Sequence, residues 1–118
     1  MNEFKLTIYH NPSCSKSRET LSLLEKNKQM PEVIEYLDNP PSRQTLKEII
    51  TRLGLPAREI LRTTETAYVE AGLDIDSMAE DDIVDAICDH PELLQRPIVV
   101  SGEKAIIGRP PTSVLSLI

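Results

Sequence analysis

The sequence has 118 residues, which is enough for one domain of ordinary size and excludes a multidomain architecture. Thirteen lysines and arginines against nineteen aspartates and glutamates give a net charge of −6, which argues against nucleic acid or an anionic membrane as a partner. An anionic ligand would therefore need a local basic pocket. Two cysteines, Cys14 and Cys88, are too few for a disulfide scaffold. With neither a secretory signal nor a long apolar run, we expect a cytoplasmic protein.

The N-terminal third predicts a strand, a helix and a second strand. Residues 4–9 alternate between polar and apolar, which is typical of a strand with one buried face. An Asn-Pro-Ser turn follows, and residues 15–26 have the leucine spacing of an amphipathic helix. Residues 32–37 form the second β-rich run. A strand-helix-strand unit of this kind favours parallel pairing.

The central part of the chain, about 42–95, predicts helices only. Ser42 is a suitable N-cap and Gly54 a suitable terminator for the first helix, and Pro56 opens a short second one. Another helix begins among the acidic residues 80–82, whose charge suits the positive end of a helix dipole. We interpret this part as a helical insertion.

The C-terminal part predicts a β-hairpin and a last helix. Residues 97–100 and 104–107 are β-rich runs separated by a short turn, so we expect them to pair antiparallel. Residues 111–118 then predict a helix with Val114, Leu115 and Ile118 turned inward. The expected fold class is α/β: a thioredoxin-like mixed four-stranded sheet with flanking helices and a helical insertion, forming a single domain over 1–118.

Cys14 lies between the first strand and the following helix. Unpaired backbone N–H groups at a helix N-terminus stabilise an anion and lower a thiol pKa, so this position suits a nucleophilic thiolate. Ser15, Ser17 and Arg18 add donors nearby. The alternative is a small buried core residue, which is how most free cysteines behave.

The position three residues after Cys14, where thioredoxins carry a second cysteine, is Ser17. Cys88 shares a helical face with Val84 and is interpreted as a core residue. A covalent intermediate on Cys14 would therefore need an external thiol to release it. This requirement points to glutathione or a glutaredoxin as the partner.

His10 and three arginines are the remaining candidate site residues. A protonated His10 would help to hold the thiolate, or His10 is a strand-end histidine with a local hydrogen bond. Arg62, Arg96 and Arg109 each lie at the boundary of a predicted element. Guanidinium forks bind tetrahedral oxyanions well, although a single arginine is more often a solvated surface charge.

The order of these residues resembles the glutaredoxin-coupled arsenate reductase (ArsC) family, in the short YfgD-like form. The resemblance rests on His10-Asn11-Pro12-Ser13-Cys14-Ser15-Lys16-Ser17-Arg18, Tyr36-Leu37 before Pro40-Pro41, Leu61-Arg62, Arg96-Pro97-Ile98-Val99-Val100 and Gly108-Arg109-Pro110. It implies a catalytic site at Cys14, His10 and Ser17, and an oxyanion site at Arg62, Arg96 and Arg109. It also implies a cis bond before Pro97.

The reaction implied by the resemblance is the reduction of arsenate to arsenite. The Cys14 thiolate forms an adduct with arsenate, and glutathione and glutaredoxin resolve this adduct. Glutathione is then a co-substrate, and no cofactor or metal is bound.

Two other functions fit the same fold. One is a glutathione-linked thiol oxidoreductase without arsenate activity. The other is a regulator of the Spx type, which binds RNA polymerase and typically uses a Cys-x-x-Cys switch that Ser17 interrupts.

Two further chemistries are less well supported by the spacing of the residues. The central acidic residues match no calcium loop or zinc set, so they predict a solvated face. A phosphatase needs a different spacing between cysteine and arginine, together with a general-acid aspartate.

Overall fold

The computed structural model describes residues 6–118, and the first part of the predicted strand over 4–9 lies outside these residues. The described chain divides into two compact units. The first runs up to Asn39 and resumes from Arg96 to the end of the chain, and the second is Pro40–Gln95. The second unit matches the expected insertion closely in its bounds. The organisation of the two as a single domain stays a prediction.

The first unit contains a mixed four-stranded sheet of order β2-β1-β3-β4. Its strands are β1 (Thr7–His10), β2 (Glu32–Glu35), β3 (Ile98–Ser101) and β4 (Lys104–Ile107). Strand β1 pairs parallel with β2 and antiparallel with β3, and β3 pairs antiparallel with β4. The expected parallel unit and antiparallel hairpin are both confirmed, and the sheet is the one predicted for a thioredoxin-like fold.

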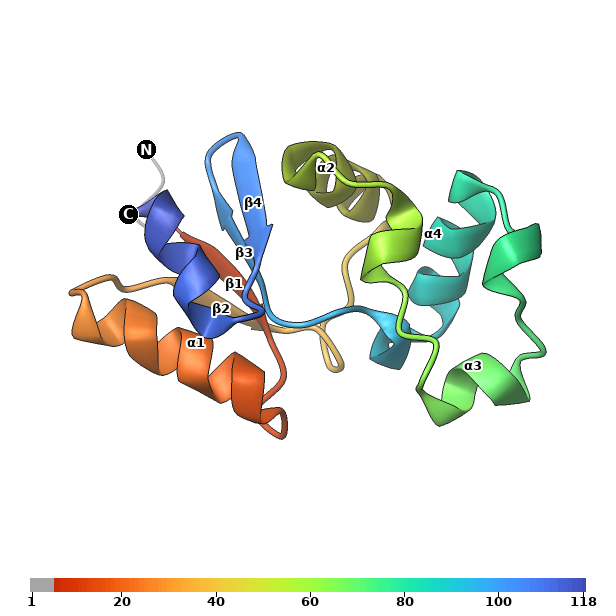
Figure 1. Cartoon of the computed structure of the whole chain (residues 1–118), viewed down its shortest axis with the longest axis horizontal. Coiled ribbons are helices and arrows are strands. Elements are labelled where there is room, and N and C mark those ends of the chain that lie inside the picture. Colours follow the sequence, from red (N-terminus) through yellow and green to blue (C-terminus); the bar gives the residue numbers. More distant parts are fainter. Residues whose placement is uncertain (1–5) are drawn as a thin grey trace. The chain divides into compact units, whose positions relative to one another are not determined.

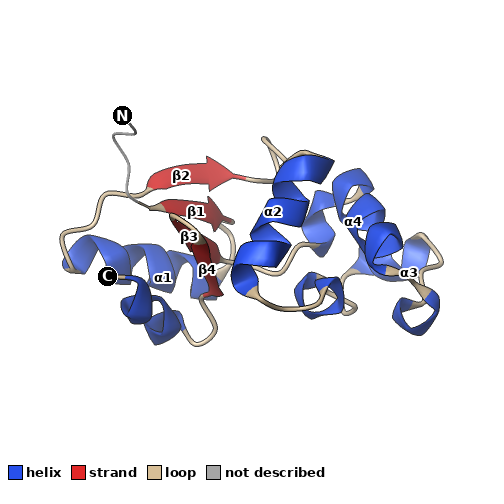
Figure 2. Cartoon of the chain, turned by 90° about the horizontal axis from the view of Figure 1, so that it is seen from above, coloured by secondary structure: helices blue, strands red, loops and turns tan. Residues whose placement is uncertain are grey.

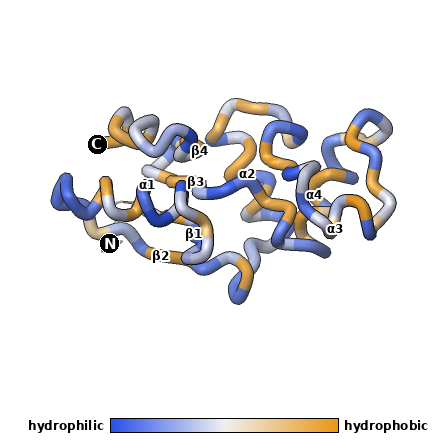
Figure 3. Tube along the Cα trace, turned by 60° about the horizontal axis from the view of Figure 1, so that its bottom comes forward, coloured by the Kyte–Doolittle hydropathy of each residue, from blue (hydrophilic) through white to orange (hydrophobic). Residues whose placement is uncertain are grey.

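Helix α1 (Ser15–Lys26) and the 3-10 helix η4 (Pro111–Leu117) lie side by side in this unit (Figures 1 and 2). The shared core consists of Leu6, Ile8, Leu24, Val99 and Val114, all of them buried. Along α1, hydrophilic and hydrophobic segments alternate, whereas β3 is largely hydrophobic (Figure 3). Leu24 of α1 is buried in this core, Leu21 and Leu23 pack against it, and the charged residues of the helix are exposed.

The C-terminal helix differs from its prediction in type. It is a 3-10 helix, whose side chains repeat every three residues, so Val114 and Leu117 share the inner face. Leu115 and Ile118 were expected to be buried on an α-helical period and are instead exposed. Leu115 and Ile118 point outward because the side chains repeat every three residues rather than about every 3.6.

The second unit is built from helices α2 (Arg43–Leu53), α3 (Thr66–Glu70) and α4 (Glu80–Asp89) with three short 3-10 turns. These turns are η1 (Ala57–Ile60), η2 (Ile75–Ser77) and η3 (Pro91–Leu93). The predicted caps of α2 are confirmed: the Ser42 side chain accepts a hydrogen bond from the Thr45 N–H, and Gly54 is left-handed with φ of 68°. Helix α3, η2 and η3 were not predicted.

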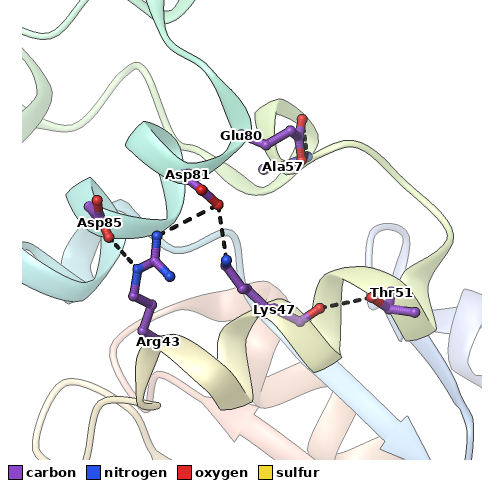
Figure 4. A network of polar contacts seen from close by, with 7 residues as sticks. All are labelled: Arg43, Lys47, Thr51, Ala57, Glu80, Asp81 and Asp85. Carbon is purple, nitrogen blue, oxygen red and sulfur yellow. Dashed lines mark hydrogen bonds and ion pairs between the residues drawn. The ribbon is translucent and has the colours of Figure 1, made fainter.

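Exposed ion pairs connect α2 to α4 (Figure 4). Arg43 Nε donates to Asp85 Oδ1 at 2.7 Å, and Lys47 Nζ lies 3.0 Å from Asp81 Oδ1. Arg43 also reaches Asp81. Exposed pairs of this kind each contribute at most about 1 kcal/mol, so buried residues such as Leu46 and Ile87 account for most of the packing. Asp81 and Asp85 are thus exposed, as predicted for a solvated acidic face, and they pair with the cations of α2.

Candidate active site

Cys14 occupies the N-cap position of α1. Its backbone is extended, with φ of −97° and ψ of 123°, and its side chain caps no N–H group through an ordinary hydrogen bond. The Arg18 N–H donates to the Cys14 carbonyl at 3.0 Å, which is the first bond of the helix. The sulfur therefore lies where a capping oxygen usually lies, facing the free N–H groups of the first turn.

The loop before Cys14 is held by its own hydrogen bonds. The Cys14 N–H donates to the Asn11 carbonyl at 3.0 Å, and the Ser13 N–H donates to Asn11 Oδ1 at 2.9 Å. From the helix, Arg18 Nη1 donates to the Pro12 carbonyl at 2.9 Å. Sequence reasoning did not assign a role to Asn11, although an asparagine before Pro-Ser is typical of such turns.

The pKa of Cys14 is lowered from the ordinary value of a thiol. Partial burial raises it, but the backbone N–H of Ser17, the Arg96 side chain, the backbone N–H of Lys16 and the Arg109 charge together outweigh that effect. The helix N-terminus and the two arginines thus stabilise the same thiolate. This agrees with the nucleophilic interpretation of Cys14, which is half-buried and in no disulfide.

Arg96 and Arg109 meet at the edge of the first unit where Cys14 lies. Arg109 Nη2 is 3.5 Å from Cys14 Sγ, and Arg109 Nε donates to the Arg96 carbonyl at 2.8 Å. The Arg96 side chain also stabilises the Cys14 thiolate and lowers the pKa of this thiol. The bonds Arg96–Pro97 and Arg109–Pro110 are both cis, so the cis bond expected before Pro97 is confirmed.

Gly108 allows the Arg109 segment to approach α1. A Cβ at this position would lie 2.6 Å from Thr20 Oγ1 and 2.8 Å from Pro97 Cγ, which are distances that side chains do not tolerate. The Gly108 N–H donates to the Pro97 carbonyl at 2.9 Å. Thr20 is fully buried, and its hydroxyl donates to the Lys16 carbonyl. Sequence analysis did not identify Gly108 and Thr20 as positioning residues, because only the fold brings them together.

His10 and Ser17 form a buried pair behind Cys14. His10 Nδ1 and Ser17 Oγ are 2.6 Å apart, and the Asn11 N–H donates to the same hydroxyl at 3.0 Å. Because Ser17 accepts from Asn11, its proton is available to donate to Nδ1 of a neutral His10. Burial lowers the pKa of His10, the Glu35 charge opposes this effect and the Arg18 charge adds to it. The structure thus shows the local hydrogen bond, and the neutral imidazole is favoured.

Arg62 belongs to the second unit, unlike the other candidate site residues. It follows η1 and is half-buried. Its Nε donates to Glu65 Oε1 at 3.1 Å, and its Nη1 donates to Gln95 Oε1 at 2.9 Å. These two partners fix the plane of the guanidinium, and neither was identified from the sequence. The role of Arg62 at an oxyanion site stays a prediction.

Cys88 has the opposite chemical environment to Cys14. It is half-buried on α4, where burial and the charges of Asp85 and Asp89 raise its pKa and the Arg43 charge only partly opposes them. A thiol in such surroundings is a poor nucleophile at neutral pH. Cys88 was expected to be a core residue, but its side chain is only half-buried and it does not belong to the buried core.

Within residues 6–118, no group of three or more histidine, cysteine, aspartate or glutamate side chains is arranged to hold a metal ion. No helix in that range is long and apolar enough to span a membrane.

Comparisons with known proteins identify the family. The model of the ArsC family matches residues 9–117. The chain is 47% identical over 115 residues to the uncharacterized protein YfgD of Escherichia coli K12, covering 97% of each chain. It is 49% identical over 107 residues to an arsenate reductase of Neisseria meningitidis, covering 90% of this chain and 92% of that one.

A solved structure agrees with this assignment. The arsenate reductase from Vibrio cholerae superposes with a TM-score of 0.93 at 44% identity, covering 99% of this chain and 100% of the other. The chain belongs to the ArsC family, whose thioredoxin-like fold it shares.

Proposed function

We propose that this protein is an arsenate reductase that uses Cys14 as its nucleophile and glutathione and glutaredoxin as its thiol partners. The observation that carries the proposal is the environment of the Cys14 sulfur, which faces a helix N-terminus and two arginine side chains. A thiolate beside donors for an oxyanion is suited to attack the central atom of that oxyanion. The names of the Neisseria and Vibrio relatives support arsenate as the substrate.

In the first step, the Cys14 thiolate attacks the arsenic of arsenate. A sulfur-arsenic bond forms, one arsenic-oxygen bond breaks, and the leaving oxygen departs as water after taking a proton. Arsenic remains pentavalent in the adduct. Arg96 and Arg109 donate to the remaining oxygens, whose charge grows in the transition state.

In the second step, the thiol of glutathione attacks the Cys14 sulfur of the adduct. A disulfide bond forms, the sulfur-arsenic bond breaks, and its electron pair stays on arsenic. Arsenic is thereby reduced to the trivalent state and leaves as arsenite, which takes up the proton of the glutathione thiol, while the two sulfurs are oxidised. A glutaredoxin thiol then exchanges with the glutathione sulfur and releases Cys14.

The other predicted site residues have supporting roles in this proposal. Arg62 adds a third guanidinium to the oxyanion site. His10 and the Ser17 side chain hold the loop that presents Cys14, and the Ser17 N–H stabilises the thiolate. The thiols supply the electrons, so the reaction requires no resident metal or organic cofactor. It requires reduced glutathione, which is consistent with a cytoplasmic location.

The experiment that tests the proposal is arsenate-dependent oxidation of NADPH, coupled through glutathione reductase in the presence of glutathione and glutaredoxin. We expect turnover by the wild type and by Cys88→Ser, and none by Cys14→Ser. Turnover by Cys14→Ser would refute the nucleophile assignment. If the wild type reduces mixed glutathione disulfides but not arsenate, the protein is a glutathione-linked oxidoreductase instead.

A further inference from the structure

A groove of about 540 Å³ lies in the first unit, between helix α1 and the start of η4. Its α1 side is lined by Arg18, Glu19 and Lys26 together with Leu23, and its η4 side begins at Pro111. Small-molecule sites in proteins commonly have volumes of roughly 300 to 1,000 Å³, so the groove can hold a ligand of tripeptide size. The oxyanion chemistry described above does not involve this groove.

Both sides of the groove begin next to the nucleophile. On α1, the Arg18 N–H donates to the Cys14 carbonyl, and the Arg18 guanidinium holds the loop at Pro12. On the other side, Pro111 closely follows Arg109, whose guanidinium contacts the Cys14 sulfur. Cys14 itself does not line the groove, and a ligand there would have one end about one helical turn from it.

The charges along the groove have a definite order. Arg18 lies at the end next to Cys14, Glu19 follows it, and Lys26 lies two helical turns further on, roughly 12 Å along the axis. An extended tripeptide spans about 10 Å, which is comparable to this separation. Leu23 supplies an apolar surface between the charges.

We propose that this groove binds the glutathione that resolves Cys14, with its two carboxylates near Arg18 and Lys26 and its ammonium near Glu19. Glutathione carries two carboxylates and one ammonium, which matches two cations and one carboxylate of the groove. The identification of glutathione as the ligand rests on the proposed function, whereas the groove can be tested without arsenate.

The test uses the reaction of Cys14 with oxidised glutathione in a Cys88→Ser background. The thiolate attacks one sulfur, a mixed disulfide forms, and one molecule of reduced glutathione leaves, so no other oxidant is needed. The same reaction with the uncharged bis(2-hydroxyethyl) disulfide measures the intrinsic reactivity of the thiolate. The measured quantity is the rate with oxidised glutathione divided by the rate with the uncharged disulfide, both at low salt. A change in the reactivity of Cys14 affects both rates, so this ratio reports the recognition of glutathione alone.

We expect Lys26→Ala and Arg18→Ala each to lower this ratio about two- to fivefold, as for a single exposed charge pair. Lys104→Ala, an exposed lysine at the start of β4, is the matched control and should leave the ratio unchanged. Glu19→Gln should also lower the ratio, because the ammonium loses its partner. General attraction of anions predicts the opposite for Glu19→Gln, since a negative charge is removed.

An unchanged ratio in Lys26→Ala, or a higher ratio in Glu19→Gln, would overturn the groove as the glutathione site. This result is separable from the proposed function. If the ratios change as expected but arsenate is not reduced, the groove stands and the arsenate assignment fails. If arsenate is reduced while all ratios remain at the wild-type value, only the groove assignment fails.

Discussion

Arg109 Nη2 lies 3.5 Å from Cys14 Sγ although the two residues are 95 positions apart in the sequence. The contact depends on the sheet, because Cys14 follows β1 and Arg109 follows β4, and the two strands are connected through β3. Arg109 Nε donates to the backbone carbonyl of Arg96, so the two arginines and the cysteine form one connected group. The reactivity of Cys14 is thus a property of the folded first unit.

The first prediction compares the two thiols of the chain. Because the pKa of Cys14 is lowered and that of Cys88 is raised, Cys14 should be alkylated by iodoacetamide much faster at pH 7. The rate for Cys14 should level off at a lower pH than the rate for Cys88. Mass spectrometry of peptides from a time course measures both rates in one sample. Equal rates at pH 7 would contradict the proposed thiolate site.

The second prediction concerns Arg109→Lys. Lysine retains the charge but cannot donate to the Arg96 carbonyl and to an oxyanion in one plane. We expect kcat/KM for arsenate to fall by roughly 10- to 100-fold. Removing an oxyanion donor completely costs about 100- to 1,000-fold in kcat, and lysine retains part of the interaction. Arg52→Lys, on the exposed last turn of α2, is the control and should behave as the wild type. Wild-type kinetics in Arg109→Lys would place the oxyanion elsewhere.

The third prediction is that Ser17→Ala destabilises the protein. The buried Ser17 hydroxyl accepts from the Asn11 N–H and pairs with His10, so its removal leaves two polar groups without that partner. The expected loss is about 1 to 3 kcal/mol in the free energy of unfolding, measured by urea titration. Ser22→Ala, on the exposed face of the same helix, should change it by less than about 0.5 kcal/mol.

The fourth prediction compares two glycines. Gly108→Ala would place a methyl group against Thr20 and Pro97, so we expect a loss of about 1 to 3 kcal/mol in stability and a lower kcat. At Gly102 a methyl group would meet no other atom, but the backbone is left-handed with φ of +59°. Gly102→Ala should therefore lower the free energy of unfolding by about 1 kcal/mol and leave kcat unchanged. Urea titration and steady-state kinetics separate these effects. An unchanged kcat in Gly108→Ala would show that the contact does not position Arg109.

The fifth prediction is a loss of stability at acidic pH that depends on His10. Burial lowers the pKa of His10 in the folded protein, so below about pH 6.5 the unfolded chain binds a proton that the folded chain does not. Stability is therefore fully present above this pH and falls as the pH decreases toward the folded pKa. His10→Gln should flatten the profile between about pH 7 and pH 5. His90→Gln tests for a general effect of losing an imidazole.

Much of the fold was predictable because its signals are local. The Ser42 and Gly54 caps and the turn between β3 and β4 each depend on a few adjacent residues. The alternation in residues 4–9 predicts a strand at β1, but the expectation of one buried face is wrong. Ile8 and Tyr9 point to opposite faces of the sheet and both are buried. The 3-10 form of η4 was not predicted, because Val114, Leu115, Leu117 and Ile118 fit either helical period. In the structure, η4 has the three-residue period and packs against α1 and β4, which are distant in the sequence.

The candidate site was predictable to a similar degree. The position of Cys14 at a helix entrance follows from the local sequence, and the structure places Arg96 and Arg109 beside it. The roles of Gly108 and Thr20 depend on a contact between distant segments, so no local pattern indicates them. The pairing of Arg62 with Gln95 is of the same kind.

The buried hydroxyl of Ser17 has a consequence for the lifetime of the proposed mixed disulfide. Position 17 is occupied by a side chain that ties the first helix to the first strand, so this helix supplies no thiol to expel glutathione from within. In the proposed cycle, release of Cys14 from its mixed disulfide therefore depends on a thiol from outside this helix. If that thiol belongs to a glutaredoxin, as proposed, the supply of reduced glutaredoxin sets the rate of the cycle.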